Sequence, residues 1–233
     1  SNKRERELVL LQCSNDVESL ASYLALLRKR CPVILMGRDV EQTLVEGIRQ
    51  KYRPDEKPEK DAAEIYPELG LLLSTSGSTG AQKLVRLSYD NIQANCDSIV
   101  EYLGLTADER PITTLPMEYT YGLSVIHSHV AVGASIILTN RTFFNPEFWD
   151  MIKDLKATSM AGVPYSYEML FNRLQLDSMD LPCLKTMTQA GGLLNPELKG
   201  KVGNWEAEKG PGFFVINGRP EIKPGHNIFP PDR

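Results

Sequence analysis

The sequence lacks the features that mark two large classes of protein. No run of about 18 consecutive apolar residues is present, so no membrane-spanning helix is expected. The formal net charge is −4, whereas nucleic-acid-binding domains usually carry a basic face. The apolar run that follows the charged residues at the start is too short for a secretory signal. The sequence therefore predicts neither a nucleic-acid partner nor a membrane span.

Cysteine is also scarce, with four residues at positions 13, 31, 96 and 183. No two of them have the C-x-x-C spacing of zinc or thioredoxin-type sites, which argues against both kinds of chemistry. Each lies beside apolar residues, so all four are predicted to be buried free thiols. Free thiols are typical of a reducing compartment, and we expect the protein to be cytoplasmic.

The rest of the composition is that of an ordinary globular protein. The 233 residues suffice for one large domain or two small ones, and 42% are hydrophobic and 24% charged. Short apolar segments alternate with amphipathic segments of helical period. Strands are expected at residues 7–13, 31–37, 68–74, 83–88, 111–116, 134–139, 157–164, 184–192 and 212–218. Helices are expected between them, the first with Asn15 or Asp16 as its N-cap.

Alternating strands and helices predict mainly parallel sheets flanked by helices. We expect an α/β fold with two subdomains, residues 1–104 and residues 105–233. In such sheets, ligands bind beyond the carboxyl ends of the strands. The oligomeric state is not indicated by the sequence.

The stretch LLLSTSGSTGAQKL, residues 71–84, is rich in hydroxyl side chains and glycine. Its spacing is neither that of the Walker phosphate loop nor that of the dinucleotide fingerprint G-x-G-x-x-G. A strand is predicted to follow it, so no helix dipole would face an anion. Hydroxyl groups, backbone N–H groups and Lys83 could nevertheless hold a phosphate. The alternative is a solvated hairpin turn, since such turns share this composition.

The segment TSGSTGAQK resembles the phosphate loop of the adenylate-forming enzymes, which include acyl-CoA synthetases, luciferases and nonribosomal-peptide adenylation domains. Gln82 stands where that family usually has proline. The resemblance continues in the family's order through LSYDNIQAN, LPMEYTYGL, AGVPYSYEML and QAGGLL. It implies the N-terminal domain of an AMP-dependent ligase. It also implies an activity, the activation of a carboxylic acid with ATP and Mg²⁺ to an acyl-adenylate, followed by transfer to coenzyme A or another thiol.

The resemblance also implies roles for particular residues. The β- and γ-phosphates would contact Thr75, Ser76, Gly77, Ser78, Thr79, Gly80 and Lys83. Gly191 and Gly192 would let the backbone approach adenine, and Gly218 would also lie at the nucleotide. The acyl pocket would be shaped by Tyr119, Tyr121, Gly122, Val163, Pro164 and Tyr165. Alternatively, these tyrosines are core residues with tethered hydroxyl groups.

Two histidines and the end of the chain complete the expectations. His127 and His129 are two apart on a predicted helix, hence on different faces, and a structural role is expected for both. The family's aromatic-Gly-x-Thr-Glu motif corresponds here to Asn-Gly-Arg-Pro-Glu, residues 217–221. The glycine and Glu221, the expected Mg²⁺ ligand, are present, but the aromatic ring and the hydroxyl are not.

The family's small C-terminal domain has no counterpart in the sequence. The sequence also looks short at its N-terminal end when it is compared with the family. We therefore expect a truncated, incomplete N-terminal domain, and no catalytic residue is assigned within it. A non-catalytic nucleotide- or acyl-binding fragment is the alternative to a ligase, and a scaffold for protein contacts is a third hypothesis. The sequence does not identify the acid or decide between coenzyme A and a carrier-protein thiol.

Overall fold

The computed structural model describes residues 6–55, 65–74, 84–209 and 214–217, which form two compact units. Unit 1 comprises residues 1–94 and 116–123, and unit 2 comprises residues 95–115 and 124–233. Among the described residues, each unit contains one four-stranded sheet. The α/β class with helix-flanked, mainly parallel sheets is thus confirmed. The predicted division at residues 104 and 105 stays a prediction.

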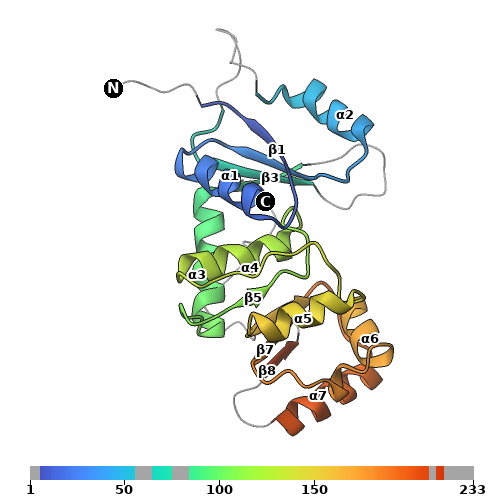
Figure 1. Ribbon diagram of the computed structural model, residues 1–233. Helices are drawn as coiled ribbons and strands as arrows, with labels where there is room; N and C mark the ends of the chain where they lie inside the picture. Colours follow the sequence, from blue (N-terminus) through green and yellow to red (C-terminus); the bar gives the residue numbers. More distant parts are fainter. Residues whose placement is uncertain (1–5, 56–64, 75–83, 210–213, 218–233) are drawn as a thin grey trace. The chain divides into compact units, whose positions relative to one another are not determined.

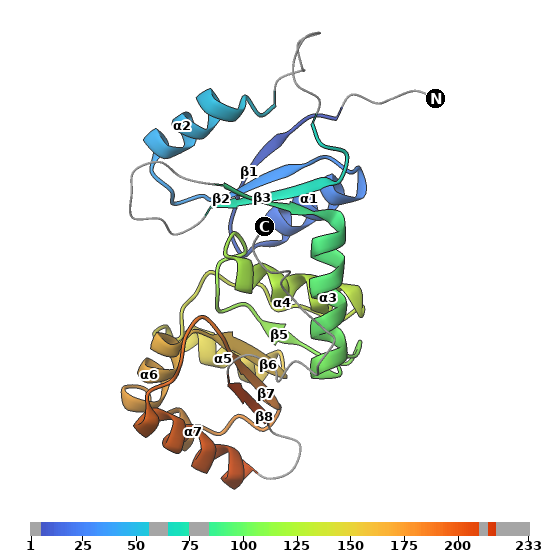
Figure 2. The ribbon, with the colours of Figure 1, turned by 180° about the vertical axis from the view of Figure 1, so that it is seen from behind.

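Unit 1 is built on a sheet with the strand order β1-β2-β3-β4 (Figure 1). Its elements are β1 (Val9–Cys13), α1 (Val17–Arg28), β2 (Val33–Gly37), α2 (Gln42–Tyr52), β3 (Leu69–Ser74) and β4 (Leu84–Ser88). The first three strands are parallel, and β4 pairs antiparallel with β3. All five residues of β2 are buried, because helices cover both faces of the sheet. Figure 2 shows the same sheet from behind, with α1 and α2 on its opposite faces.

The amide groups at the start of α1 are capped as the sequence predicts. Asp16 is the N-cap residue, and its Oδ1 atom accepts a hydrogen bond from the Ser19 N–H at 2.7 Å. The other carboxylate oxygen accepts from the Ser14 hydroxyl at 2.6 Å and from Arg38 Nη1 at 2.8 Å. These hydrogen bonds, that from Ser14 first, lower the pKa of Asp16 to about 2.

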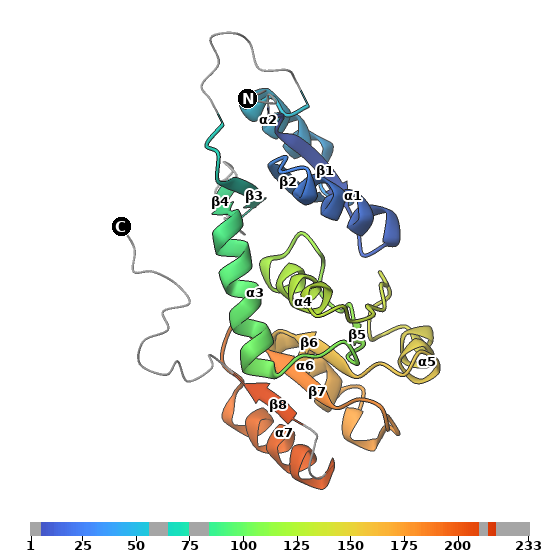
Figure 3. The ribbon, with the colours of Figure 1, turned by 90° about the vertical axis from the view of Figure 1, so that its left-hand side faces the viewer.

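Unit 2 is built on a parallel sheet with the strand order β5-β6-β7-β8. Its strands are β5 (Pro111–Ile112), β6 (Ser159–Gly162), β7 (Thr186–Gln189) and β8 (Phe214–Asn217). The helices around it are α3 (Tyr89–Leu103), α4 (Thr120–Ala131), α5 (Pro146–Asp154), α6 (Pro164–Asn172), the 3₁₀ helix Leu176–Ser178 and α7 (Pro196–Lys209). The first turns of α3 and α4 belong to unit 1. Figure 3 shows α7 running beside β8.

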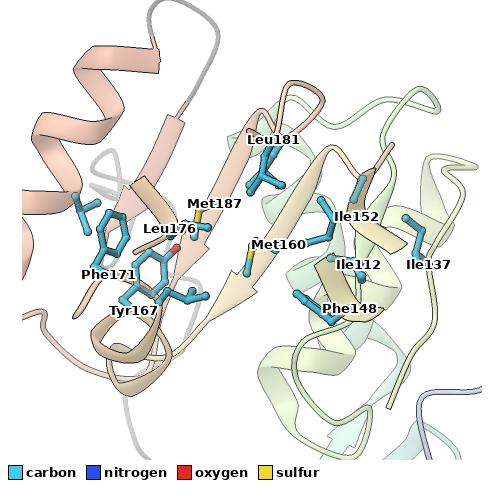
Figure 4. Close-up of a cluster of buried hydrophobic side chains, with 14 of the residues drawn as sticks. Ile112, Ile137, Phe148, Ile152, Met160, Tyr167, Phe171, Leu176, Leu181 and Met187 are labelled. Atoms are coloured by element: carbon cyan, nitrogen blue, oxygen red, sulfur yellow. The ribbon is translucent and has the colours of Figure 1, made fainter. Parts of the chain in front are cut away.

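The core of unit 2 lies between one face of its sheet and α5, α6 and α7. Met160 and Met187 face it from neighbouring strands, and Phe148 and Tyr167 meet them from two helices (Figure 4). Each of these four side chains is at least 97% buried. Burying a large apolar side chain stabilises a fold by roughly 1.5–3 kcal/mol. Their contacts therefore fix the helices on the sheet.

Two predicted strands prove wrong in their extent. Regular pairing in β5 ends at Ile112, and residues 134–139 contribute a single bridge, from Ile137 to Ile112. The cause is the Thr113 side chain, whose Oγ1 atom accepts from the Thr139 N–H at 2.9 Å and donates to the Thr139 carbonyl oxygen at 3.0 Å. A side chain thus takes the place of the next backbone pair.

The cysteine prediction is half correct. All four cysteines are free, and Cys13 and Cys96 are buried. Cys31 and Cys183 are only partly buried, contrary to the expectation. In the part of the chain that the structure describes, no helix is both long and apolar enough to span a bilayer.

The Asp16 cap leads to a stability prediction. Replacing Asp16 by Ala should lower the free energy of unfolding by about 1 kcal/mol, because the Ser19 N–H loses its acceptor. Asp16→Asn is the matched control, since asparagine caps helices about as well as aspartate. Urea unfolding at neutral pH measures both variants. Equal losses in the two variants would show that the charge near Arg38, rather than the cap, stabilises this corner.

Candidate functional site

Three segments meet where β5, β6 and β7 end. Thr114 follows β5, residues 163–165 follow β6, and residues 190–192 follow β7. Because these strands are parallel, their carboxyl ends lie at one edge of the sheet. The Thr114 hydroxyl donates a hydrogen bond to the Ala161 carbonyl oxygen, and the Ala190 N–H donates to the Gly162 carbonyl oxygen at 3.3 Å. Hydrogen bonds therefore tie the three strand ends together.

The turn from β6 into α6 places three of the residues predicted for the acyl pocket. Val163 precedes the helix, and its N–H donates to the Ser166 hydroxyl at 3.4 Å. Pro164 is the first helical residue. The N–H group at this position has no partner within the helix, so its absence in proline costs no hydrogen bond. Tyr165 follows it with 62% of its surface exposed. A Cβ atom on Gly162 would lie 3.1 Å from Ser166 Cβ, so the glycine lets the helix start close to the strand.

The glycine pair after β7 is shaped by the protein itself. Gly191 has φ of +89°, a backbone conformation that side chains with a Cβ rarely adopt. A Cβ atom on Gly192 would lie 3.1 Å from Cγ of Pro164. The sequence interpretation explained both glycines by the approach of adenine. The structure gives each of them a reason within the chain, and the role toward a nucleotide stays a prediction.

Gln189 is a residue of this site that the sequence interpretation missed. Its side chain is 97% buried at the end of β7, and its Nε2 atom donates to the Gly192 carbonyl oxygen at 3.0 Å. The bond spans Gly191 and so holds the glycine turn in shape. A polar side chain at the end of an apolar strand, directly before two glycines, was the available signal. Thr114 was missed in the same way.

The other three predicted acyl-pocket residues lie in unit 1, at the start of α4. Tyr119 directly precedes the helix, is 42% exposed, and donates its N–H to the Pro116 carbonyl oxygen at 3.1 Å. Tyr121 is half-buried and Gly122 is buried in the first turn. Tyr119 and Tyr165 are too exposed to be core residues, so the alternative interpretation is wrong for these two.

Glu118, beside Tyr119, is a third residue that was missed. Its Oε1 atom lies 2.5 Å from where a Cβ atom of Gly37 would be, at the end of β2. Burial raises the pKa of this carboxyl group, and the charge of Asp39 raises it further. Burial also raises the pKa of the Cys13 thiol to about 12, with Glu118 as the second cause. The signal in the sequence was a carboxylate among apolar and aromatic residues.

The remaining predicted site residues lie outside the described residues. These are Thr75, Ser76, Gly77, Ser78, Thr79, Gly80, Lys83, Gly218 and Glu221. Within residues 6–55, 65–74, 84–209 and 214–217, no group of three or more His, Cys, Asp or Glu side chains is placed to hold a metal ion.

Burial shifts the pKa of both histidines of α4. His129 is 96% buried, and its Nδ1 atom lies 2.7 Å from the Val125 carbonyl oxygen. A carbonyl oxygen can only accept, so Nδ1 carries a hydrogen. Burial lowers the pKa of His129, and it lowers the pKa of His127 to about 4.

The comparisons with known proteins agree with one another. The family described as "AMP-binding enzyme" matches residues 5–208. The chain is 25% identical over 175 residues to a feruloyl-CoA synthase of an Amycolatopsis species, across 72% of this chain and 35% of that protein. It is 31% identical over 143 residues to the indoleacetate–CoA ligase of Aromatoleum aromaticum, across 59% of this chain and 28% of that protein.

A solved structure shows the same fold. ATP-bound MatB from Rhodopseudomonas palustris matches with a TM-score of 0.73 and 20% sequence identity, across 92% of this chain and 50% of that one. The chain thus spans about half of this structure and about a third of the length of the two relatives.

The histidines generate a prediction about pH. Their folded pKa values lie below the ordinary value of 6.5, so the unfolded chain binds protons that the folded chain does not. Stability should be full above about pH 7 and should fall toward about pH 4, by at most about 1.4 kcal/mol per pH unit for each histidine. Urea unfolding across this range measures the slope, which His127→Gln should reduce. An unchanged slope in that variant would contradict the assignment.

The glycine turn generates a second prediction. Gly191→Ala should lower the free energy of unfolding by about 1–2 kcal/mol, because its φ is positive. Gly203→Ala is the matched control in α7, where an added Cβ meets no atom within 4 Å. It should instead stabilise the helix by about 0.5–1 kcal/mol. Thermal unfolding of both variants checks the opposite signs, and a neutral Gly191→Ala would show that the turn is not strained.

Proposed function

Because the chain belongs to the AMP-binding enzyme family, we propose that it is part of an AMP-forming ligase that activates a carboxylic acid with ATP. The product would be an acyl-adenylate, and a thiol such as coenzyme A would then accept the acyl group. The chain covers about a third of the length of its relatives, so the activity is proposed for the protein that contains it. The free thiols support the cytoplasmic location that we also propose.

The observation that supports this proposal best is the meeting of three strand ends in unit 2. Gly191 and Gly192 are exposed there and present backbone without side chains. The ring of Tyr165 is exposed beyond the neighbouring strand. Such an edge suits a flat, planar group such as adenine, because glycine lets the ring approach the backbone. Val163, Pro164 and Tyr165 would line the acyl group, as would Tyr119, Tyr121 and Gly122 in their own unit.

The chemistry requires the protein to hold two anions together. A carboxylate oxygen attacks the α-phosphorus of ATP, and the bond from that phosphorus to the bridging oxygen of the β-phosphate breaks, which releases pyrophosphate. The acyl carbon then carries AMP, a better leaving group than oxide. Hydroxyl and N–H groups of residues 75–80, with Lys83, would neutralise the β- and γ-phosphates. Gly218 would also lie at the nucleotide. Bound Mg²⁺ would screen the phosphate charge. The described residues contain no cluster of His, Cys, Asp or Glu side chains that could hold a metal ion. Glu221 would therefore be the Mg²⁺ ligand.

A second candidate function is nucleotide or acyl binding without turnover. Asn217 is the last residue of β8 and pairs in register with Gln189 of β7. It therefore stands at the same edge as the glycine turn, at the position where the family carries an aromatic ring. Stacking of a base on an aromatic ring is worth roughly 1–3 kcal/mol in nucleic-acid sites. Without this stacking interaction, ATP would bind more weakly and adenylation would be slower.

Two measurements separate these functions. Pyrophosphate release is measured with this chain, and with the longer protein that contains it, on phenylpropenoic, indoleacetic and long-chain fatty acids. Calorimetry with ATP and with a non-hydrolysable acyl-adenylate analogue runs in parallel. Turnover in the longer protein supports the ligase, and binding without turnover in both forms supports the second function. Binding to neither ligand would contradict both.

The charge at position 83 provides the matched variants. Lys83→Ala should weaken ATP binding by about 10- to 100-fold, since a charge-assisted hydrogen bond is worth roughly 1.5–3 kcal/mol. Lys153→Ala, in the exposed last turn of α5, removes the same charge elsewhere and should leave ATP binding unchanged. Equal effects of the two variants would show that only the net charge matters.

A further inference from the structure

We propose that Glu118 is a positioning residue, which anchors residues 116–122 on the carboxyl end of β2 by occupying the space that Gly37 leaves. The inference rests on the proposed function, in which Tyr119, Tyr121 and Gly122 of this segment shape the acyl pocket. Glu118 would thus act on acid binding through its neighbours, without touching the acid.

The contact between Glu118 and Gly37 is a close steric fit. Gly37 is buried, and a Cβ atom there would lie 2.5 Å from Oε1 and 3.3 Å from Cδ of Glu118. Real Cβ atoms do not approach so closely, so any other residue at this position would compete with the carboxyl group. The φ of Gly37 is not positive, so backbone conformation does not require glycine here. A Cβ at this position would therefore have to displace the Glu118 carboxyl group.

The residues on either side of Glu118 differ in burial. Met117 is 99% buried, whereas Tyr119 is 42% exposed. The Tyr119 N–H donates to the Pro116 carbonyl oxygen at 3.1 Å, and the Leu123 N–H donates to the Tyr119 carbonyl oxygen at 2.9 Å. The backbone of Tyr119 thus makes hydrogen bonds both to the turn before α4 and to the first turn of α4. Movement of Glu118 would therefore be passed to the neighbouring tyrosine through the backbone.

The charges around Glu118 indicate that its shape matters more than its charge. The charge of Asp39, two residues after the end of β2, acts on Glu118, and the charge of Glu118 acts on Cys13 at the end of β1. Arg38 and Asp16 act on the same thiol, but they are already paired with each other at 2.8 Å. Burial and Asp39 both disfavour the charged carboxylate. A neutral side chain of the same size should therefore serve as well.

The test uses a double-mutant cycle. In Gly37→Ala the new methyl group displaces Glu118, because the atom in its way is the end of a flexible side chain. Glu118→Ala removes the anchor itself, and Glu118→Gln keeps its size. Gly47→Ala is the matched control, because its added Cβ meets no atom within 4 Å in α2 of the same unit.

The first readout is calorimetric affinity. Gly37→Ala and Glu118→Ala should each weaken binding of an acyl-adenylate analogue by about tenfold, while ATP affinity changes by less than about twofold. The double variant should be no weaker than Glu118→Ala, because the clash has lost its partner. Glu118→Gln and Gly47→Ala should bind like the parent. Additive losses in the double variant, or a loss in Glu118→Gln equal to that in Glu118→Ala, would overturn the proposal.

The second readout separates the anchor from the proposed function. Hydrogen exchange of a peptide covering residues 116–123 should accelerate by about tenfold in Gly37→Ala and Glu118→Ala but not in Glu118→Gln. If the parent protein binds neither ligand, the proposed function fails, and hydrogen exchange still decides on the anchor. Unchanged exchange in both alanine variants overturns it, even where the acyl-adenylate analogue binds.

Discussion

Parallel pairing of short strands is the constraint on which the rest of the structure depends. It places the segments after β5, β6 and β7 at one edge of the second sheet, and those after β1 and β2 at one edge of the first. Hydrophobic side chains of the helices pack against the sheets, and the polar residues of the candidate site follow the strand ends. The glycine turn, the Tyr165 ring and Glu118 are all products of this geometry.

Much of the fold could be predicted, because hydrophobic periodicity and capping are local. The first helix begins after Asp16 as expected, and apolar runs mark β2, β3 and β6. The failures have non-local causes. The strand expected at 134–139 is reduced to one bridge, because the hydroxyl of Thr113, more than 20 residues away, takes the backbone groups of Thr139. Periodicity cannot reveal such a contact.

The candidate site was predicted less evenly than the fold. The glycine pair and the segment at Pro164 were found from a motif, and the structure brings them within van der Waals reach of each other. Gln189 and Glu118 were missed, because their significance comes from partners that no motif records. The phosphate-loop residues 75–80 lie outside the described residues and remain a prediction from resemblance.

The glycines show why resemblance to a motif and a role in binding must be argued separately. A Cβ at Gly192 would crowd Pro164, and the positive φ of Gly191 favours glycine, whether or not a nucleotide is bound. The pair would therefore be needed in a binding module as well as in a ligase. What distinguishes the two functions is the neighbouring strand, where Asn217 stands beside Gln189. The glycine turn is thus explained by packing and backbone conformation alone, so its presence does not by itself establish a function.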